Sequence, residues 1–167
     1  MTIDELSEYG MQRMDDEEIE NFLKIQNQGV LGLPTENAPY LLPMSYGFDG
    51  GSRLYFYYVV GAQSRKEDLS VQAETASFLV YNAEMFHWRS VLLTGTIQNV
   101  PEEKQANLTE AQIPTWRPEL IKTASKTEEA RFYEFQIEEH TGIRHDIQAP
   151  TFDQRSSRDD KNIVDGG

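Results

Sequence analysis

Hydrophobic and polar residues alternate along several short stretches of this chain, which is the pattern of strands with one buried face. In the stretch TASFLVYN, Phe78 and Val80 fall on one face with Asn82, whereas Leu79 and Tyr81 fall on the other. The same pattern, read along the whole chain, predicts six strands at residues 29–33, 40–48, 53–60, 75–82, 88–100 and 131–139. The sequence therefore predicts a mainly β fold.

A single amphipathic helix is predicted before the first strand, over residues 15–28. Asp15 can cap this helix, and Glu18, three residues later, completes a capping-box pattern. Ile19 and Phe22 lie on one face of it, so we expect that face to pack on the sheet.

Glycine and proline positions qualify the predicted strands. Gly29 and Gly32 indicate either curvature of the first strand or a lack of room for side chains. Pro43 lies inside the second strand and has no N–H to donate, so we expect that strand to be an edge strand, bulged or locally open there. The turn at residues 49–52 (DGGS) predicts a hairpin, and Gly142 is expected to end the last strand.

The length of 167 residues suits one domain, which we place at residues 1–148, followed by a polar tail at residues 149–167. The tail composition predicts a flexible segment or an arm on a partner subunit. The chain has no cysteine, which excludes disulfides and thiol chemistry. Neither a secretory signal nor an apolar run of membrane-spanning length is evident, so we expect a cytoplasmic protein.

The charge is strongly negative, with 28 acidic and 15 basic residues and a net charge of −13. Nucleic-acid binding surfaces need clustered Lys and Arg, so the composition argues against that class of partner. The acids are scattered along the chain. We interpret them as a solvated surface adapted to high salt, in preference to a docking face for a basic partner.

One short segment, Ser64-Arg65-Lys66, places a hydroxyl and two cations at the predicted start of a helix. Cations are unfavourable at the positive end of a helix, so two of them there suggest a bound anion. Helix N–H groups, a hydroxyl and cations together favour phosphate. The alternative is a solvated helix start with no ligand.

Three motifs, taken in order, resemble the FMN-binding split β-barrel family, which includes pyridoxamine 5'-phosphate oxidases and nitroimidazole-resistance flavoproteins. They are Pro43-Met44-Ser45-Tyr46-Gly47, then Gly61-x-x-Ser64-Arg65-Lys66-x-x-x-Leu69, and then Trp88-x-Ser90-Val91-x-x-x-Gly95. The substrate-binding signature of the oxidases is not evident towards the C-terminus, so the chain looks more similar to the second group.

The resemblance implies a six-stranded antiparallel split β-barrel with peripheral helices and FMN as cofactor. It also implies a homodimer with the flavin at its interface and oxidoreductase activity on a small molecule, such as flavin or nitro-compound reduction. No catalytic side chain is assigned, because the cofactor carries the chemistry. The cofactor-binding residues that the resemblance implies are Pro43, Met44, Ser45, Tyr46, Tyr58, Val59, Val60, Ser64, Arg65, Lys66, Ser90 and Val91.

Other chemistry finds less support in the sequence. The histidines His87, His140 and His145 lack metal-ligand spacing, and no Gly-x-Ser-x-Gly motif is present. A non-catalytic flavin, haem or F420 carrier on the same barrel is the alternative function, with His140 or His145 as the axial ligand for haem. Trp116, between two prolines, fits a cofactor cleft, a subunit interface or the core equally well.

Overall fold

The computed structural model describes residues 2, 5, 7–59, 64–105, 107–108 and 130–146. The strands are β1 (Met11–Arg13), β2 (Gln28–Leu33), β3 (Tyr40–Ser45), β4 (Gly47–Phe48), β5 (Arg53–Val59), β6 (Ala76–Ala83), β7 (His87–Asn99) and β8 (Ala130–Asp146). The helices are the 3-10 helix η1 (Ser7–Tyr9) and the α-helices α2 (Asp16–Ile25), α3 (Arg65–Gln72) and α4 (Glu102–Gln105).

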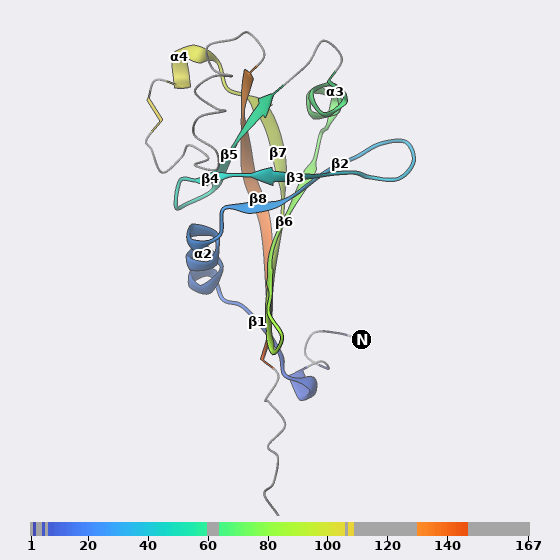
Figure 1. Cartoon of the computed structure of the whole chain (residues 1–167), viewed down its shortest axis with the longest axis vertical. Coiled ribbons are helices and arrows are strands. Elements are labelled where there is room, and N and C mark those ends of the chain that lie inside the picture. The colour runs from blue at the N-terminus through green and yellow to red at the C-terminus, as the bar shows by residue number, and fades with distance from the viewer. Residues whose placement is uncertain are drawn as a thin grey trace, which may run out of the picture.

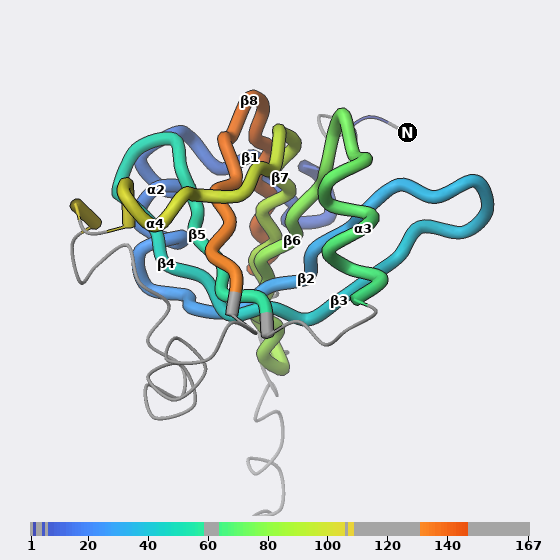
Figure 2. Tube along the Cα trace, turned by 90° about the horizontal axis from the view of Figure 1, so that it is seen from above, coloured from blue at the N-terminus to red at the C-terminus, as the bar shows by residue number. Residues whose placement is uncertain are grey.

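All the strands join one antiparallel sheet in the order β3-β2-β6-β7-β8-β5-β4, with β1 added beside β8. The sheet is curled into a half-barrel, with β6, β7 and β8 along the long axis of the molecule and β2 and β3 crossing it (Figures 1 and 2). This confirms the predicted mainly β, antiparallel split-barrel fold. The short strand β1 was not predicted.

The core lies on the concave side of the sheet, under α2. Phe78, Val80 and Val91 are fully buried there, and the apolar face of α2 joins the same cluster. The predicted capping box holds the start of this helix: the Asp15 N–H donates to Glu18 Oε2 at 2.9 Å, and the Glu18 N–H donates to Asp15 Oδ1 at 2.8 Å. The local pattern therefore predicted both the helix start and the face that it buries.

Helix α2 ends at Ile25, three residues before the predicted end at residue 28. Gln26 is already extended, and Gln28 pairs with Ser45 as the first residue of β2. The Asn27 carbonyl accepts a hydrogen bond from the Tyr46 N–H at 3.0 Å. Pairing with residues 45 and 46 of the same chain thus ends the helix. The sequence has no local helix-stop signal at this point.

The predicted strand at residues 40–48 is divided into β3 and β4 at Tyr46. The Tyr46 side chain is buried, and its hydroxyl donates to the Leu23 carbonyl of α2 at 2.8 Å. Its ring meets the edge of the Phe78 ring, with centroids 5.5 Å apart. The break therefore follows from a tyrosine that turns into the core to hold α2.

Gly142 does not end the last strand, as the sequence suggested, but lies inside β8. A Cβ at this position would lie 2.8 Å from Ile19 Cγ1 and 2.9 Å from Met14 Cβ. The Gly142 carbonyl also accepts a hydrogen bond from the Met14 N–H at 2.9 Å. The glycine is there because α2 and the residues before it approach the strand closely.

Pro43 in β3 and Gly29 in β2 each have a structural reason. Strand β3, with Pro43, is an edge strand whose one neighbour in the sheet is β2, as predicted. At Gly29, a Cβ would lie 2.5 Å from the Phe78 ring, so lack of room explains this glycine.

Several predicted features lie outside the described residues, namely Val60, Trp116 and the tail at residues 149–167. No helix among the described residues is long and apolar enough to cross a membrane. The same part of the chain holds no group of three or more His, Asp or Glu side chains that could bind a metal ion.

Candidate functional site

The start of α3 is built as the sequence predicted. Ser64 is the N-cap in an extended conformation, and its Oγ accepts a hydrogen bond from the Glu67 N–H at 3.4 Å. Arg65 and Lys66 are the first two residues of the helix. The first turn therefore carries two adjacent cations where the helix dipole is positive.

Each of these two cations lies over an aromatic ring. The Arg65 guanidinium carbon is 5.2 Å from the centre of the Tyr40 ring, and Lys66 Nζ is 5.1 Å from the centre of the Tyr58 ring. In the part of the chain that the structure describes, neither cation has an ion pair. A cation–π contact holds a cation in place without neutralising its charge, so both remain able to bind an anion.

A buried hydrogen-bond chain fixes α3 to strand β5. The Ser70 hydroxyl donates to the Lys66 carbonyl at 2.6 Å, and Tyr58 Oη lies 2.8 Å from Ser70 Oγ. Because Ser70 has one hydroxyl proton and gives it to Lys66, Tyr58 is the donor to Ser70. The Tyr58 ring also stacks on Tyr133, with centroids 4.3 Å apart. Tyr58 thus positions the first turn of α3 and its cations.

Lys66 is partly desolvated in the free protein. Partial burial lowers the pKa of Lys66 below its ordinary value of 10.5, and the nearby Glu67 carboxylate opposes this in part. Desolvation disfavours an isolated charge, so a bound anion would remove that penalty.

A groove of about 490 Å³ lies along the predicted Pro43–Ser45 segment. The paired residues of β2 and β3 line it together with Gln26 and Asn27, which follow α2, and with Tyr81 of β6. The lining residues are Gln26, Asn27, Gln28, Gly29, Val30, Pro43, Met44, Ser45 and Tyr81. Main-chain groups of an edge strand are thereby exposed to a space that a planar ring can enter.

The remaining predicted residues divide into those that face the core and those that do not. The Tyr46 and Val91 side chains are buried in the core, so they offer a ligand only their main chain. Burial also raises the pKa of Tyr46, which keeps its hydroxyl protonated. Ser90 of β7 pairs with Tyr81 of β6, and Tyr81 lines the groove. Val59 ends β5, ahead of α3.

Strand β3 links the two parts of the candidate site. Tyr40, under Arg65, and Pro43, in the groove, are three residues apart on this strand, which is about 10 Å. Because an odd spacing puts their side chains on opposite faces of β3, one ligand that reached both would pass round the free edge of this strand.

Next to Arg65, on the side of the β2–β3 hairpin, is a second space of about 510 Å³. It is lined by Thr35, Glu36, Asn37, Ala38, Pro39, Tyr40, Leu41 and Arg65. It extends the candidate site past the two cations and away from the groove.

Sequence reasoning missed Tyr40, Ser70, Tyr81 and the Gln26–Val30 wall of the groove. Ser70 carried a usable signal, since it lies four residues after Lys66 and so on the same side of the helix. The others carried none, because their role depends on how β2, β3 and β6 pair.

Comparison with known proteins agrees with this fold. Residues 15–144 match the family model described as pyridoxamine 5'-phosphate oxidase. No protein with a curated function matches the chain.

Among solved structures, an FAD-binding protein from Mesorhizobium loti is similar with a TM-score of 0.64 at 18% identity, over 80% of this chain and 96% of that one. A putative pyridoxamine 5'-phosphate oxidase from Corynebacterium glutamicum gives 0.63 at 17% identity, over 84% and 96%. A putative 5-nitroimidazole antibiotic resistance protein from Bacteroides thetaiotaomicron gives 0.59 at 16% identity, over 81% and 89%.

Proposed function

Because this chain belongs to the pyridoxamine 5'-phosphate oxidase-like family of FMN-binding split barrels, we propose that it binds FMN and reduces or oxidises a small molecule with it. The flavin ring occupies the groove beside Pro43–Ser45, and the phosphate lies at the start of α3.

The observation that carries the proposal is the pair of uncompensated cations, Arg65 and Lys66. The chain has 28 acidic residues against 15 basic ones, yet the described residues pair neither cation with a carboxylate. Rigid donors, a helix start and two full charges are the features that bind a phosphate dianion. Ser64 adds a hydroxyl proton, since its cap uses the oxygen as an acceptor.

The chain's own contribution is to bind and orient. Main-chain groups of Pro43–Tyr46 and the Ser90 hydroxyl hold the ring. When bound, the flavin supplies hydride and electron transfer. No acid–base side chain is required by this assignment.

We propose that the second half of the site comes from a second copy of the chain. The convex face of the sheet next to the groove is apolar: Leu41, Tyr81 and Leu92 are 66%, 57% and 45% exposed. Pro43, two residues from Leu41 and paired with Val30 of β2, extends this surface along β3. An exposed apolar patch of this kind marks an interface, and a partner there would close the groove over the ring.

The dimer has a direct test. Leu92→Asp would place a charge in the interface, and we expect a monomer by sedimentation. Val71→Asp is the matched control, because Val71 is 73% exposed on α3, away from this face, and should leave the dimer intact. A monomeric wild-type protein would contradict the assignment.

FAD is a second candidate cofactor, on one specific observation. The space of about 510 Å³ beside Arg65 has room for more than the phosphate of FMN, and the similar Mesorhizobium loti protein is FAD-binding. Tyr40, an aromatic residue, is in its wall, where an adenine could stack.

The experiment that tests the cofactor is an absorbance spectrum of the purified protein, followed by identification of what heat releases. We expect flavin bands near about 450 nm and released FMN. Released FAD would select the second candidate. A colourless protein that takes up neither added FMN nor FAD would refute flavin binding, and a haem spectrum would favour the alternative carrier.

Haem has little support from the two histidines considered for it. His140 Nε2 lies 2.9 Å from Asp16 Oδ1, and His145 Nε2 lies 2.8 Å from the Tyr9 carbonyl. Both are engaged within the chain. Oxidoreductase activity itself would be assayed with NAD(P)H and nitro compounds once the flavin is identified.

A further inference from the structure

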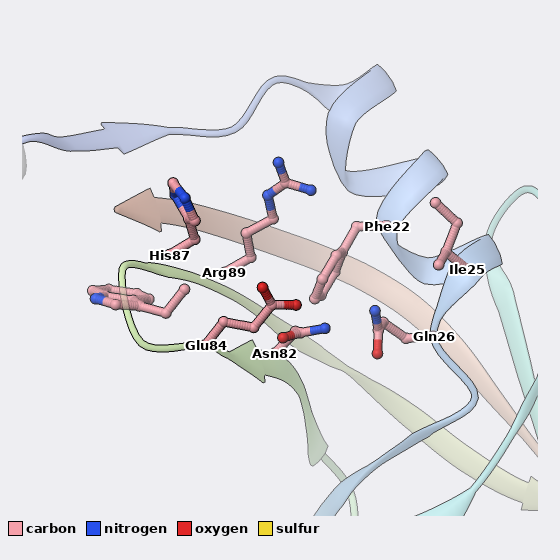
Figure 3. A pocket seen from close by; sticks show the side chains of 8 residues that line it. Phe22, Ile25, Gln26, Asn82, Glu84, His87 and Arg89 are labelled. Carbon is pink, nitrogen blue, oxygen red and sulfur yellow. The ribbon is translucent and has the colours of Figure 1, made fainter. Parts of the chain in front are cut away.

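A second pocket, of about 230 Å³, lies between α2 and the hairpin that joins β6 to β7. Phe22, Ile25 and Gln26 approach it from the helix, and Asn82, Glu84, His87 and Arg89 approach it from the hairpin (Figure 3). Trp88 completes the wall. Gln26 also lines the flavin groove, and Trp88 is part of one motif of the family resemblance, but Asn82, Glu84 and Arg89 belong to neither.

This hairpin pocket is on the other face of the sheet from the residues next to the flavin groove. Asn82 and Arg89 pair across the strands and continue the buried rows of Val80 and Val91. Their side chains therefore face α2. Tyr81 and Ser90, one position along each strand, face the opposite side.

Arg89 lines this pocket without forming an ion pair with any described residue. Its cross-strand neighbour on β8 is a second cation, Arg144. Arg144 has its own partners, Glu18 at 3.3 Å and Asp146 at 3.7 Å. No ion pair of Arg89 occurs within the described ranges, so like charges stand side by side and one of them lacks compensation.

Glu84 gives the pocket a free negative group as well. Its backbone N–H donates to the His87 carbonyl at 2.8 Å, but its carboxylate has no partner among the residues that the structure describes. Among the residues that line the pocket, Arg89 is the one arginine or lysine and Glu84 is the one carboxylate. A ligand with only a negative charge would satisfy Arg89 and leave Glu84 without a partner.

The rest of the wall is apolar and aromatic. The ring of Phe22 is buried, and Ile25 is 77% exposed at the mouth. The Trp88 side chain, one position from Arg89, is on the opposite face of the sheet from α2, where its ring lies beside His145 with centroids 5.7 Å apart. The volume is below the roughly 300–1,000 Å³ of sites for drug-sized ligands, which selects a ligand with about one ring.

We propose that the hairpin pocket binds a small zwitterion with an apolar body, of the class of the apolar α-amino acids. Arg89 holds its carboxylate, with the Asn82 amide beside it. Glu84 holds its ammonium group, and Phe22 and Ile25 contact the side chain. The proposal stands on residues outside the flavin site and does not depend on the flavin assignment.

The test is calorimetric titration of the full chain with three probes that differ by one charged group. L-phenylalanine carries both groups, 3-phenylpropanoate lacks the ammonium, and 2-phenylethylamine lacks the carboxylate. We expect L-phenylalanine to bind with a Kd below about 1 mM. Each of the other two should bind at least about tenfold more weakly, because one charge-assisted contact is lost.

Two variants locate the binding. Arg89→Gln and Glu84→Gln should each weaken L-phenylalanine binding by at least about tenfold. Arg53→Gln and Glu103→Gln make the same changes at exposed positions on β5 and α4 and should leave the Kd within twofold. Thermal melting of each variant separates loss of the ligand from loss of the fold.

Three results would overturn the proposal. One is the absence of L-phenylalanine binding up to about 10 mM, and another is an unchanged Kd in a folded Arg89→Gln protein. The third is equal affinity for 3-phenylpropanoate and L-phenylalanine, which would make the ligand a simple anion. Because the titration needs no flavin, each result is independent of whether the protein binds one.

Discussion

At the start of α3, Arg65 and Lys66 lie over aromatic rings, whereas next to the β6–β7 hairpin Arg144 lies between the carboxylates of Glu18 and Asp146. The two regions are near opposite ends of the molecule (Figure 1). Both gather positive charge in a chain with a net charge of −13.

The difference between these regions lies in what their charges can still do. A tyrosine ring orients a cation and does not neutralise its charge. The α3 region therefore presents two cations without ion pairs to a dianion. A carboxylate neutralises its partner, so the hairpin region is close to balanced and suits a ligand that carries both signs. The two ends of the sheet thus suit different ligands: a dianion at α3 and a zwitterion at the hairpin pocket.

The largest expected effect comes from charge reversal. Lys66→Glu should lower FMN affinity by about a hundredfold or more, because it removes one charge-assisted contact and adds repulsion. Arg89→Glu makes the same change in the hairpin pocket and should alter FMN affinity by less than twofold. Fluorescence titration measures both, and equal losses would show that the two regions are not distinct.

A smaller effect is expected from the hydrogen-bond chain that positions α3. Tyr58→Phe leaves Ser70 Oγ without its donor and should cost about 1–2 kcal/mol of unfolding free energy, with a few-fold loss of FMN affinity. Tyr57→Phe is the control, since Tyr57 is half-buried on the same strand. Denaturant unfolding and FMN titration of the two variants give the comparison; identical behaviour would remove Tyr58 from this role.

The lowered pKa of Lys66 predicts a modest fall of FMN affinity with rising pH. Above about pH 6 the phosphate is a dianion, so its charge is constant. Burial lowers the pKa of Lys66 below its ordinary value of 10.5 in the free protein, so affinity should fall as alkaline pH removes this proton. Lys66→Arg keeps its charge and should show no such fall; parallel curves for the two proteins across the alkaline range would contradict the assignment.

The smallest effect concerns the acidic surface as a whole. Molar salt screens repulsion among exposed charges, so the melting temperature should rise by a few degrees between low and molar KCl. Calorimetric scans in matched buffers measure this. A flat response would reject salt adaptation and return the acidic surface to the alternative of a face for a basic partner.

Local chemistry made much of this structure predictable. Asp15 and Glu18 define the start of α2 within four residues of sequence, and Ser64 caps α3 in the same local way. The alternation around Phe78 and Val80 assigned the two faces of β6, because strand geometry alone decides it.

Features that depend on distant partners were not predictable. Gly142 lies inside β8 because Met14 and Ile19 pack against it, and Tyr46 interrupts a strand because it reaches the Leu23 carbonyl. The hairpin pocket likewise joins residues from α2, β6 and β7, with no shared sequence pattern. Of the candidate flavin residues, Ser64, Arg65 and Lys66 were indicated by their own chemistry as well as by family resemblance, and the others by resemblance alone; their role remains a prediction.

The most direct test of the phosphate assignment compares FMN with riboflavin, which lacks the phosphate, in the wild-type protein and in the Arg65→Ala/Lys66→Ala variant. We predict that the wild type binds FMN at least about tenfold more tightly than riboflavin. In the variant, FMN affinity should fall to that of riboflavin, whose own affinity should not change. An FMN preference that survives the double substitution would contradict the account, because the phosphate would then be bound elsewhere.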